Sequence, residues 1–399
     1  MTQPYSSDAP DPPWLVPRAA YVHVPFCAHH CGYCDFAIAA GKDSWIELYV
    51  DALAAELARL DGPREVDTLF IGGGTPTYLS VPQLGRLLQA ITRWLPLRPG
   101  GEFTIESNPG TFDADKVGVL ADHGVNRLSL GAQSFQPHLL KALERDHRPE
   151  DVPRAVESAR AHIDSISIDL IFAVPGQTLP DWQEDLNRAL ALGPDHLSTY
   201  GLTFEKGTPL WKQQQRGQVE ALDEDLELAL YEHAMDRLAA AGFEHYEISN
   251  HALPGRRSRH NQVYWANEAY WGFGMGAARY VAGRRDLNTR DLQGYIRKCL
   301  AGESVVFQSE MLEPRERAVE TMALQLRRGD GIDRPAFAVQ TGHRLDDLVG
   351  EAIAHHLQIG LLAEDGPAVR LTRRGRCVAD AVIRSLMRTA SRANTPPAR

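Results

Sequence analysis

The chain has 399 residues, of which 43% are hydrophobic and 24% are charged, as expected for a globular protein that buries one large core and a smaller second domain. Its formal net charge of -10 argues against general binding to nucleic acid or to an anionic membrane surface. At most peripheral contact with a membrane is expected.

No run approaches the roughly 18 apolar residues of a membrane span, and the N-terminus lacks a basic segment followed by an apolar one. The sequence therefore predicts a cytoplasmic protein. Residues 1–18 are rich in Pro, Ser and Asp, which predicts a disordered leader, and residues 386–399 are predicted to form a flexible tail.

The cysteines are unevenly spaced. Three of the five lie within positions 27–34, while Cys299 and Cys377 are isolated. An odd count with this spacing is not typical of a disulfide framework. It favours a clustered ligand set in a reducing compartment, with Cys299 and Cys377 as inert packing thiols.

Between residues 19 and 241, short β-branched runs alternate with longer amphipathic segments. Repeated strand–helix units predict a parallel sheet, and six units favour an α/β fold of the incomplete (β/α)6 TIM-like type. A doubly wound open sheet is the alternative. Strands are predicted at 19–24, 66–71, 102–106, 127–131, 165–172 and 196–202, and helices near 43–60, 80–94, 113–123, 150–161, 180–191 and 221–241.

The remainder divides into two parts. Residues 242–310 are dense in aromatic residues, His and Gly with little periodicity, which favours a segment that shapes a site. Residues 311–385 read as helices followed by a β-hairpin that turns at 365–367, which predicts a smaller C-terminal helical, winged-helix-like domain.

The motif CAHHCGYC places Cys27, Cys31 and Cys34 on one loop directly after the first strand. A structural zinc ion requires four closed ligands, and His29, His30 or Asp35 would have to supply the fourth. Three thiolates also suffice for a four-iron, four-sulfur cluster whose remaining iron takes an outside ligand. The cluster is favoured, with zinc as the alternative.

Polar or glycine-rich residues follow strand after strand. They include the run Gly72–Thr75, then Glu106, Gln133 and Asp169. The carboxyl ends of parallel strands in a β/α barrel share one face, so these groups are expected to converge on one ligand. Taken singly, the glycines also fit a strand-to-helix turn, and each acid also fits a buried or capping carboxylate.

Several segments together resemble the radical S-adenosylmethionine family, in the branch that holds the oxygen-independent coproporphyrinogen III dehydrogenases (HemN) and the haem chaperones (HemW). They are YVHVPFCAHHCGYCDF, FIGGGTPT, ESNPGTF, GAQSF, ERDH and SIDLIFAVPGQT. The resemblance spans about residues 19–380 and implies a [4Fe-4S] cluster on Cys27, Cys31 and Cys34. It also implies S-adenosylmethionine contacts from Tyr21, Tyr33, Gly73, Gly74, Thr75, Glu106, Gln133, Arg145 and Asp169.

Two features separate the branches. The dehydrogenases continue the loop with a further cysteine two residues after the third, where this chain has Phe36. Residues 260–265 match the HNxxYW pattern of the chaperones, which implies haem contacts from His260, Asn261, Tyr264 and Trp265, with Arg256, Arg257 and Arg259 near the propionates. Without the resemblance, His260 would be read as part of a loop packed on the barrel.

The favoured hypothesis is a haem chaperone that passes haem to an apo-haemoprotein, for which a respiratory-chain protein is one candidate. The alternative is a radical enzyme acting on porphyrinogen propionates. Whether the chain forms a homodimer is left open. GFGMGA at 272–277 lacks the strand–helix setting of a dinucleotide site, and Arg370, Arg373, Arg374 and Arg376 on an acidic protein favour a solvated surface over nucleic-acid binding.

Overall fold

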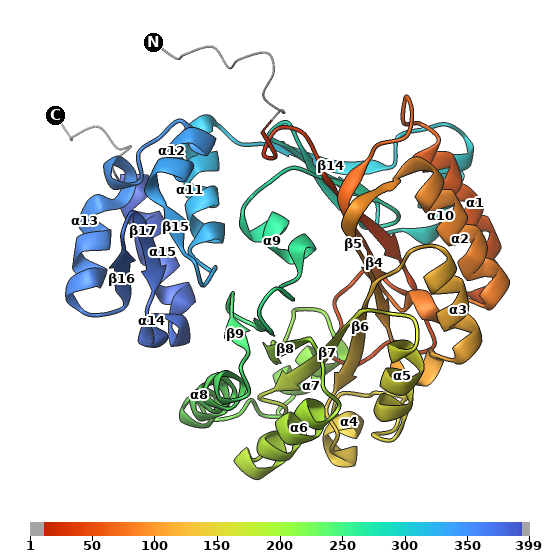
Figure 1. Ribbon diagram of the computed structural model, residues 1–399, viewed down its shortest axis with the longest axis horizontal. Coiled ribbons are helices and arrows are strands. Elements are labelled where there is room, and N and C mark those ends of the chain that lie inside the picture. The colour runs from red at the N-terminus through yellow and green to blue at the C-terminus, as the bar shows by residue number, and fades with distance from the viewer. Residues whose placement is uncertain (1–11, 393–399) are drawn as a thin grey trace.

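A computed structural model describes residues 12–392 (Figure 1). The predicted parallel strands are confirmed as β1 (Ala19–Val24), β4 (Val66–Gly73), β5 (Leu97–Ser107), β6 (Arg127–Gln133), β7 (Ser165–Phe172) and β8 (His196–Gly201). The helices between and after them are α1 (Ile46–Leu57), α2 (Val81–Trp94), α3 (Ala114–Asp122), α4 (Pro137–Ala142), α5 (Asp151–Arg160), α6 (Leu179–Ala191), α7 (Pro209–Gln215) and α8 (Glu224–Ala240). Consecutive strands are neighbours in the sheet, which curves into an incomplete barrel.

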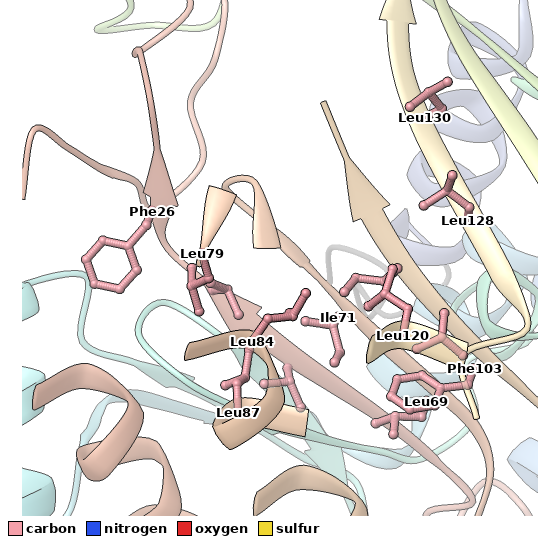
Figure 2. Close-up of a cluster of buried hydrophobic side chains, with 14 of the residues drawn as sticks. Phe26, Leu69, Ile71, Leu79, Leu84, Leu87, Phe103, Leu120, Leu128 and Leu130 are labelled. Carbon is pink, nitrogen blue, oxygen red and sulfur yellow. The ribbon is translucent and has the colours of Figure 1, made fainter. Parts of the chain in front are cut away.

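Hydrophobic and polar side chains alternate along the strands, so the sheet has one hydrophobic face and one polar face. Figure 2 shows side chains of the buried face, and Leu69, Ile71, Phe103, Leu128 and Leu130 are at most 1% exposed. They pack with Leu84 and Leu87 of α2 and Leu120 of α3 in one core cluster. Because successive side chains of a strand point to opposite faces, the intervening polar residues face the lumen.

The segment 242–310 is more regular than expected. It supplies strands at both ends of the sheet: β9 and β10 lie beyond β8, and β11 pairs in parallel with β1 before β12, β13 and β14 continue the edge. The elements are β9 (Glu244–His245), β10 (Asn250–Ala252), α9 (Arg259–Trp265), β11 (Tyr270–Phe273), β12 (Ala278–Val281), β13 (Arg284–Asn288), α10 (Leu292–Leu300) and β14 (Val306–Met311).

The C-terminal domain has a core of its own and a three-stranded antiparallel sheet. The predicted hairpin is present as β16 and β17. The predicted tail at 386–399 starts later than expected, because the last helix runs to Arg392 and buries Leu386 and Ala390. The elements are α11 (Pro314–Gln325), β15 (Ile332–Asp333), α12 (Arg334–Thr341), α13 (Leu345–Gln358), β16 (Leu362–Asp365), β17 (Ala368–Leu371), α14 (Arg373–Cys377) and α15 (Ala379–Arg392).

Of the predicted leader, residues 1–11 lie outside the described residues, as do residues 393–399 of the predicted tail. Residues 12–16 form a turn, and the Pro13 carbonyl accepts a hydrogen bond from the Ala269 backbone amide. No helix among residues 12–392 is both long and apolar enough to cross a membrane.

Candidate cofactor site in the barrel

A cavity of about 560 Å³ opens at the carboxyl ends of the parallel strands. It brings together every residue that the resemblance assigned to the cluster and to S-adenosylmethionine. These are Cys27, Cys31, Cys34, Tyr21, Tyr33, Gly73, Gly74, Thr75, Glu106, Gln133, Arg145 and Asp169. These side chains therefore line one cavity, as the positions at the strand ends led us to expect.

The cysteine loop leaves β2 (Phe26–Cys27) and returns at β3 (Ala39–Ala40), which pairs in parallel with β2. The Thr75 hydroxyl donates to Cys27 Sγ over 3.7 Å, and Arg145 Nη1 donates to Cys31 Sγ over 3.5 Å. Burial raises the pKa of Cys27 to about 12 and that of Cys34 to about 11. Without a metal these thiols stay protonated, so metal binding must release protons.

The fourth ligand that zinc requires is not assembled. His30 Nε2 donates to the Cys34 carbonyl over 3.0 Å, and His29 Nε2 lies 3.8 Å from Glu144 Oε2. Among residues 12–392, no group of three or more His, Cys, Asp and Glu side chains is placed to hold a metal ion. Thiolates of a four-iron cluster bind separate irons and need not meet at one point. The donor set therefore fits the cluster better than a closed zinc site.

A backbone amide of the glycine run binds a carboxylate of the protein itself. The Gly73 amide donates to Glu106 Oε2 over 2.9 Å. Gly73 has φ of +107°, and a Cβ there would lie 2.3 Å from the His23 ring. Burial raises the pKa of Glu106 to about 7, and the charge of Asp169 adds to this rise while the Gly73 hydrogen bond opposes it. A partly buried carboxylate of this kind is suited to pair with an incoming ammonium group.

Asp169 lies inside a cradle of three serine hydroxyls. Ser198, Ser129 and Ser167 donate to its carboxylate over 2.7, 2.8 and 3.3 Å. Burial raises its pKa, and these hydrogen bonds limit the rise. The serines were missed from the sequence, although they occupy lumen-facing positions of β6, β7 and β8 that the strand alternation could have identified.

The two tyrosines that the resemblance assigned to S-adenosylmethionine have different surroundings. The Tyr21 hydroxyl pairs with His23 Nδ1 over 3.0 Å, and His23 Nε2 donates to the Ala37 carbonyl over 2.8 Å. These two hydrogen bonds connect β1 to the end of the cysteine loop. Tyr33 packs on the small apolar cluster that includes Leu139 and Ile171.

His260 differs from the accessible imidazole that the sequence indicated. It is 1% exposed, and burial lowers its pKa to about 3. Its Nδ1 pairs with the Thr68 hydroxyl over 2.9 Å and its Nε2 with the Tyr264 hydroxyl over 2.8 Å. The start of α9 is fixed by Glu102, which accepts from the amides of Arg259 and His260. His260 therefore has no free ring nitrogen in this structure.

The four predicted haem contacts do not lie together. His260, Asn261 and Tyr264 line the barrel cavity, whereas Trp265 is outside its lining and lies under the Arg327 guanidinium. Figure 1 shows α9 between the barrel and the C-terminal domain, and the Gln325 and Gln340 side chains donate to the Ala266 carbonyl at its end.

The arginines expected near haem propionates are engaged within the protein. Arg257 pairs with Glu244 and Asp330, Arg256 Nε lies 3.6 Å from Asp195 Oδ1, and Arg259 donates to the Gly100 carbonyl. None of the three lines the cavity.

The remaining motifs take structural roles. In the GFGMGA run, the Gly274 amide donates a hydrogen bond to Glu56 of α1. None of the residues in this run lines the cavity. Arg370 and Arg373 pair with Asp365 and Asp236, while Arg376 donates to His245. Three of the four arginines that the sequence singled out in this domain therefore have partners within the protein. Cys299 is buried and Cys377 is partly buried, without disulfides.

The barrel, the three-cysteine loop and the C-terminal domain define a radical S-adenosylmethionine protein with a HemN-type C-terminal extension. The Radical SAM superfamily profile matches residues 21–189, and the HemN C-terminal domain profile matches residues 312–378. The fold is similar to that of the coproporphyrinogen III oxidase HemN from Escherichia coli, with a TM-score of 0.81 over 94% of this chain and 90% of that chain. At 22% identity, this likeness concerns the fold alone.

Curated relatives are more similar in sequence. The chain is 37% identical to the heme chaperone HemW of Bacillus subtilis, covering 92% of this chain and 98% of that protein. It is 39% identical to HemW of Synechocystis over 80% of each chain, and 34% identical to HemW of Escherichia coli over 91% of this chain and 96% of the relative. The chain belongs to the HemW family of haem chaperones.

Proposed function

We propose that this protein binds haem and transfers it to an apo-haemoprotein, and that it carries a [4Fe-4S] cluster on Cys27, Cys31 and Cys34 with S-adenosylmethionine beside it. Support comes from relatives that are named heme chaperones and cover most of the chain. Further support comes from the cavity that joins the cysteine loop to the lumen carboxylates. We place this activity in the cytoplasm.

The cavity residues suit S-adenosylmethionine by their chemistry. Glu106 supplies a carboxylate for the amine, while Asp169 keeps acceptor capacity for ribose hydroxyls beside its serine donors. Arg145 Nη2 is fixed by the Gly131 carbonyl over 2.8 Å, which holds its guanidinium beside Cys31. When bound, the cluster supplies the electron for reductive cleavage of S-adenosylmethionine in proteins of this superfamily.

The exposed Phe36 ring is the observation that most favours the chaperone hypothesis. It stands where the dehydrogenases have a further cysteine, and it is 59% exposed beside the cavity. An aromatic ring there offers no thiol to a cluster or a substrate, but it offers a face to a planar apolar ligand. The loop thus supplies a contact surface where the enzyme branch supplies a reactive group.

A radical enzyme acting on porphyrinogen propionates is the second candidate. It is favoured by the full set of cavity residues that match S-adenosylmethionine contacts, because a carrier of haem alone has no evident need for them. This reading shares the cluster site with the chaperone reading and differs only in the fate of the tetrapyrrole.

The test is an anaerobic incubation of the reconstituted, reduced protein with coproporphyrinogen III and S-adenosylmethionine, followed by analysis for decarboxylated product. We expect no turnover and, in a parallel sample, stoichiometric haem binding. Robust decarboxylation would overturn the chaperone reading. A protein that binds neither tetrapyrrole contradicts both.

A further inference from the structure

Three histidines line the cavity, and only one of them has an accessible imidazole. His260 uses both ring nitrogens within the protein, as described above. His196 does the same, because its Nδ1 pairs with Ser167 and its Nε2 with Tyr246, each over 2.8 Å. Both rings are buried, and burial lowers their pKa values, so both are neutral and committed to the protein interior.

His29 is the exception. It lies in the cysteine loop between Cys27 and Cys31, and its side chain is 50% exposed. Its nearest charged neighbour is the Glu144 carboxylate at 3.8 Å, and it makes no hydrogen bond within the part of the chain that the structure describes. An imidazole with an open nitrogen is the side chain that haem iron most often takes as an axial ligand.

An apolar rim lies beside this imidazole. Phe36 is 59% exposed and Tyr200 is 42% exposed, although both line the cavity. Phe36 comes from the cysteine loop and Tyr200 from the end of β8, so the two rings reach the cavity from different elements. Ile38 and Leu202 add aliphatic surface to the lining. Exposed aromatic side chains at the mouth of a cavity are typical of a docking surface.

A positively charged side chain, Arg290, lies next to this part of the cysteine loop. Arg290 is exposed, and its guanidinium donates to the Asp35 carbonyl, directly before Phe36 in the chain. A guanidinium has five N–H donors in a planar fork that suits carboxylates. The lining therefore supplies an open imidazole and aromatic faces, and Arg290, which is not itself part of the lining, lies next to it through Asp35, a lining residue. These are the three kinds of group that bind the iron, the ring and the propionates of a metalloporphyrin.

We propose that haem docks at the mouth of the cavity against Phe36 and Tyr200, with His29 as its iron ligand and Arg290 near a propionate. This inference rests on the proposed function and gives haem a site other than the 260–265 segment. In this arrangement α9 forms the inner wall of the cavity, and haem lies on the solvent side of the cluster loop.

The test is a titration of the full-length, cluster-reconstituted protein with ferric haem under anaerobic conditions, followed by difference spectra in the Soret region. His29→Ala is compared with His162→Ala, which removes an exposed histidine that does not line the cavity. Phe36→Ala is compared with Phe307→Ala, which removes a ring of β14 that is 75% exposed and does not line the cavity. Iron and sulfide contents are measured for every variant.

We expect His29→Ala to change the Soret band and to weaken haem binding by about tenfold or more. Phe36→Ala should weaken binding with the band position unchanged, and both control variants should behave as wild type. Added imidazole should restore the wild-type band of His29→Ala.

Results that contradict this inference can be distinguished from results that contradict the proposed function. If His29→Ala keeps the wild-type band while His260→Ala loses it, the ligand lies on α9 and the inference is overturned. A Phe36→Ala variant with wild-type affinity overturns the aromatic contact, and a lack of imidazole rescue overturns the ligand role. A wild-type protein that binds no haem refutes the proposed function itself.

Discussion

The Gly73 amide donates to Glu106 Oε2 over 2.9 Å and thereby joins the end of β4 to the end of β5. Gly73 tolerates φ of +107°, and Glu106 is a partly buried carboxylate whose pKa is raised by burial to about 7. The contact fixes the carboxylate at the cavity wall, so an ammonium group that enters the cavity meets an acceptor already in place.

Glu106→Gln should weaken S-adenosylmethionine binding. The amide oxygen can still accept from Gly73, but the negative charge that pairs with the ligand amine is lost. A hydrogen bond to a charged group contributes about 1.5–3 kcal/mol, so affinity should fall by about ten- to a hundredfold. Calorimetric titration of the cluster-loaded protein measures this, with Glu205→Gln at the exposed rim as the control. Equal affinities for both variants would remove Glu106 from the amine site.

Glu106 should also make the unliganded protein less stable as the pH rises. Its pKa in the folded protein, about 7, exceeds its usual value of 4.5, so the native state holds the proton longer than the unfolded state. Between these pH values the free energy of unfolding should fall by about 2–3 kcal/mol through this group. Urea denaturation of wild type and Glu106→Gln across that range tests the point: the difference between them should grow with pH in favour of Gln.

Cys31→Ser should abolish the cluster, because the loop supplies only three thiolates and each of them is expected to bind one iron of the cluster. Cys299→Ser is the matched control, since that thiol is buried in the core behind the sheet. Iron and sulfide analysis after anaerobic reconstitution distinguishes them. Full iron content in Cys31→Ser would refute the assignment of the cluster to this loop.

Gly73→Ala should destabilise the fold by about 2 kcal/mol or more, because its φ is unfavourable for alanine and the added Cβ would lie 2.3 Å from the His23 ring. Gly118→Ala is the control. Gly118 lies in α3 with open space around it, so alanine there should raise stability by up to about 1 kcal/mol. Denaturant midpoints measure both, and a neutral Gly73→Ala variant contradicts the close packing.

The parallel strands could be predicted because β-branched runs such as 165–172 are local signals, and the strand ends place Glu106 and Asp169 on one face once a barrel is assumed. The position of α9 could not be predicted. His260 is buried because Thr68 and Glu102, distant in the sequence, bind it. The regular strands in 242–310 escaped prediction for a similar reason, since β11 is stabilised by pairing with β1.

Anaerobic transfer of haem from the loaded, cluster-reconstituted protein to candidate apo-haemoproteins, with and without S-adenosylmethionine, tests the central claim most directly. The account predicts that the acceptor gains its native haem spectrum while this protein loses its haem spectrum. This transfer should be faster than uptake of free haem from solution by the same acceptor. Transfer no faster than from free haem, for every acceptor and in both conditions, would contradict it.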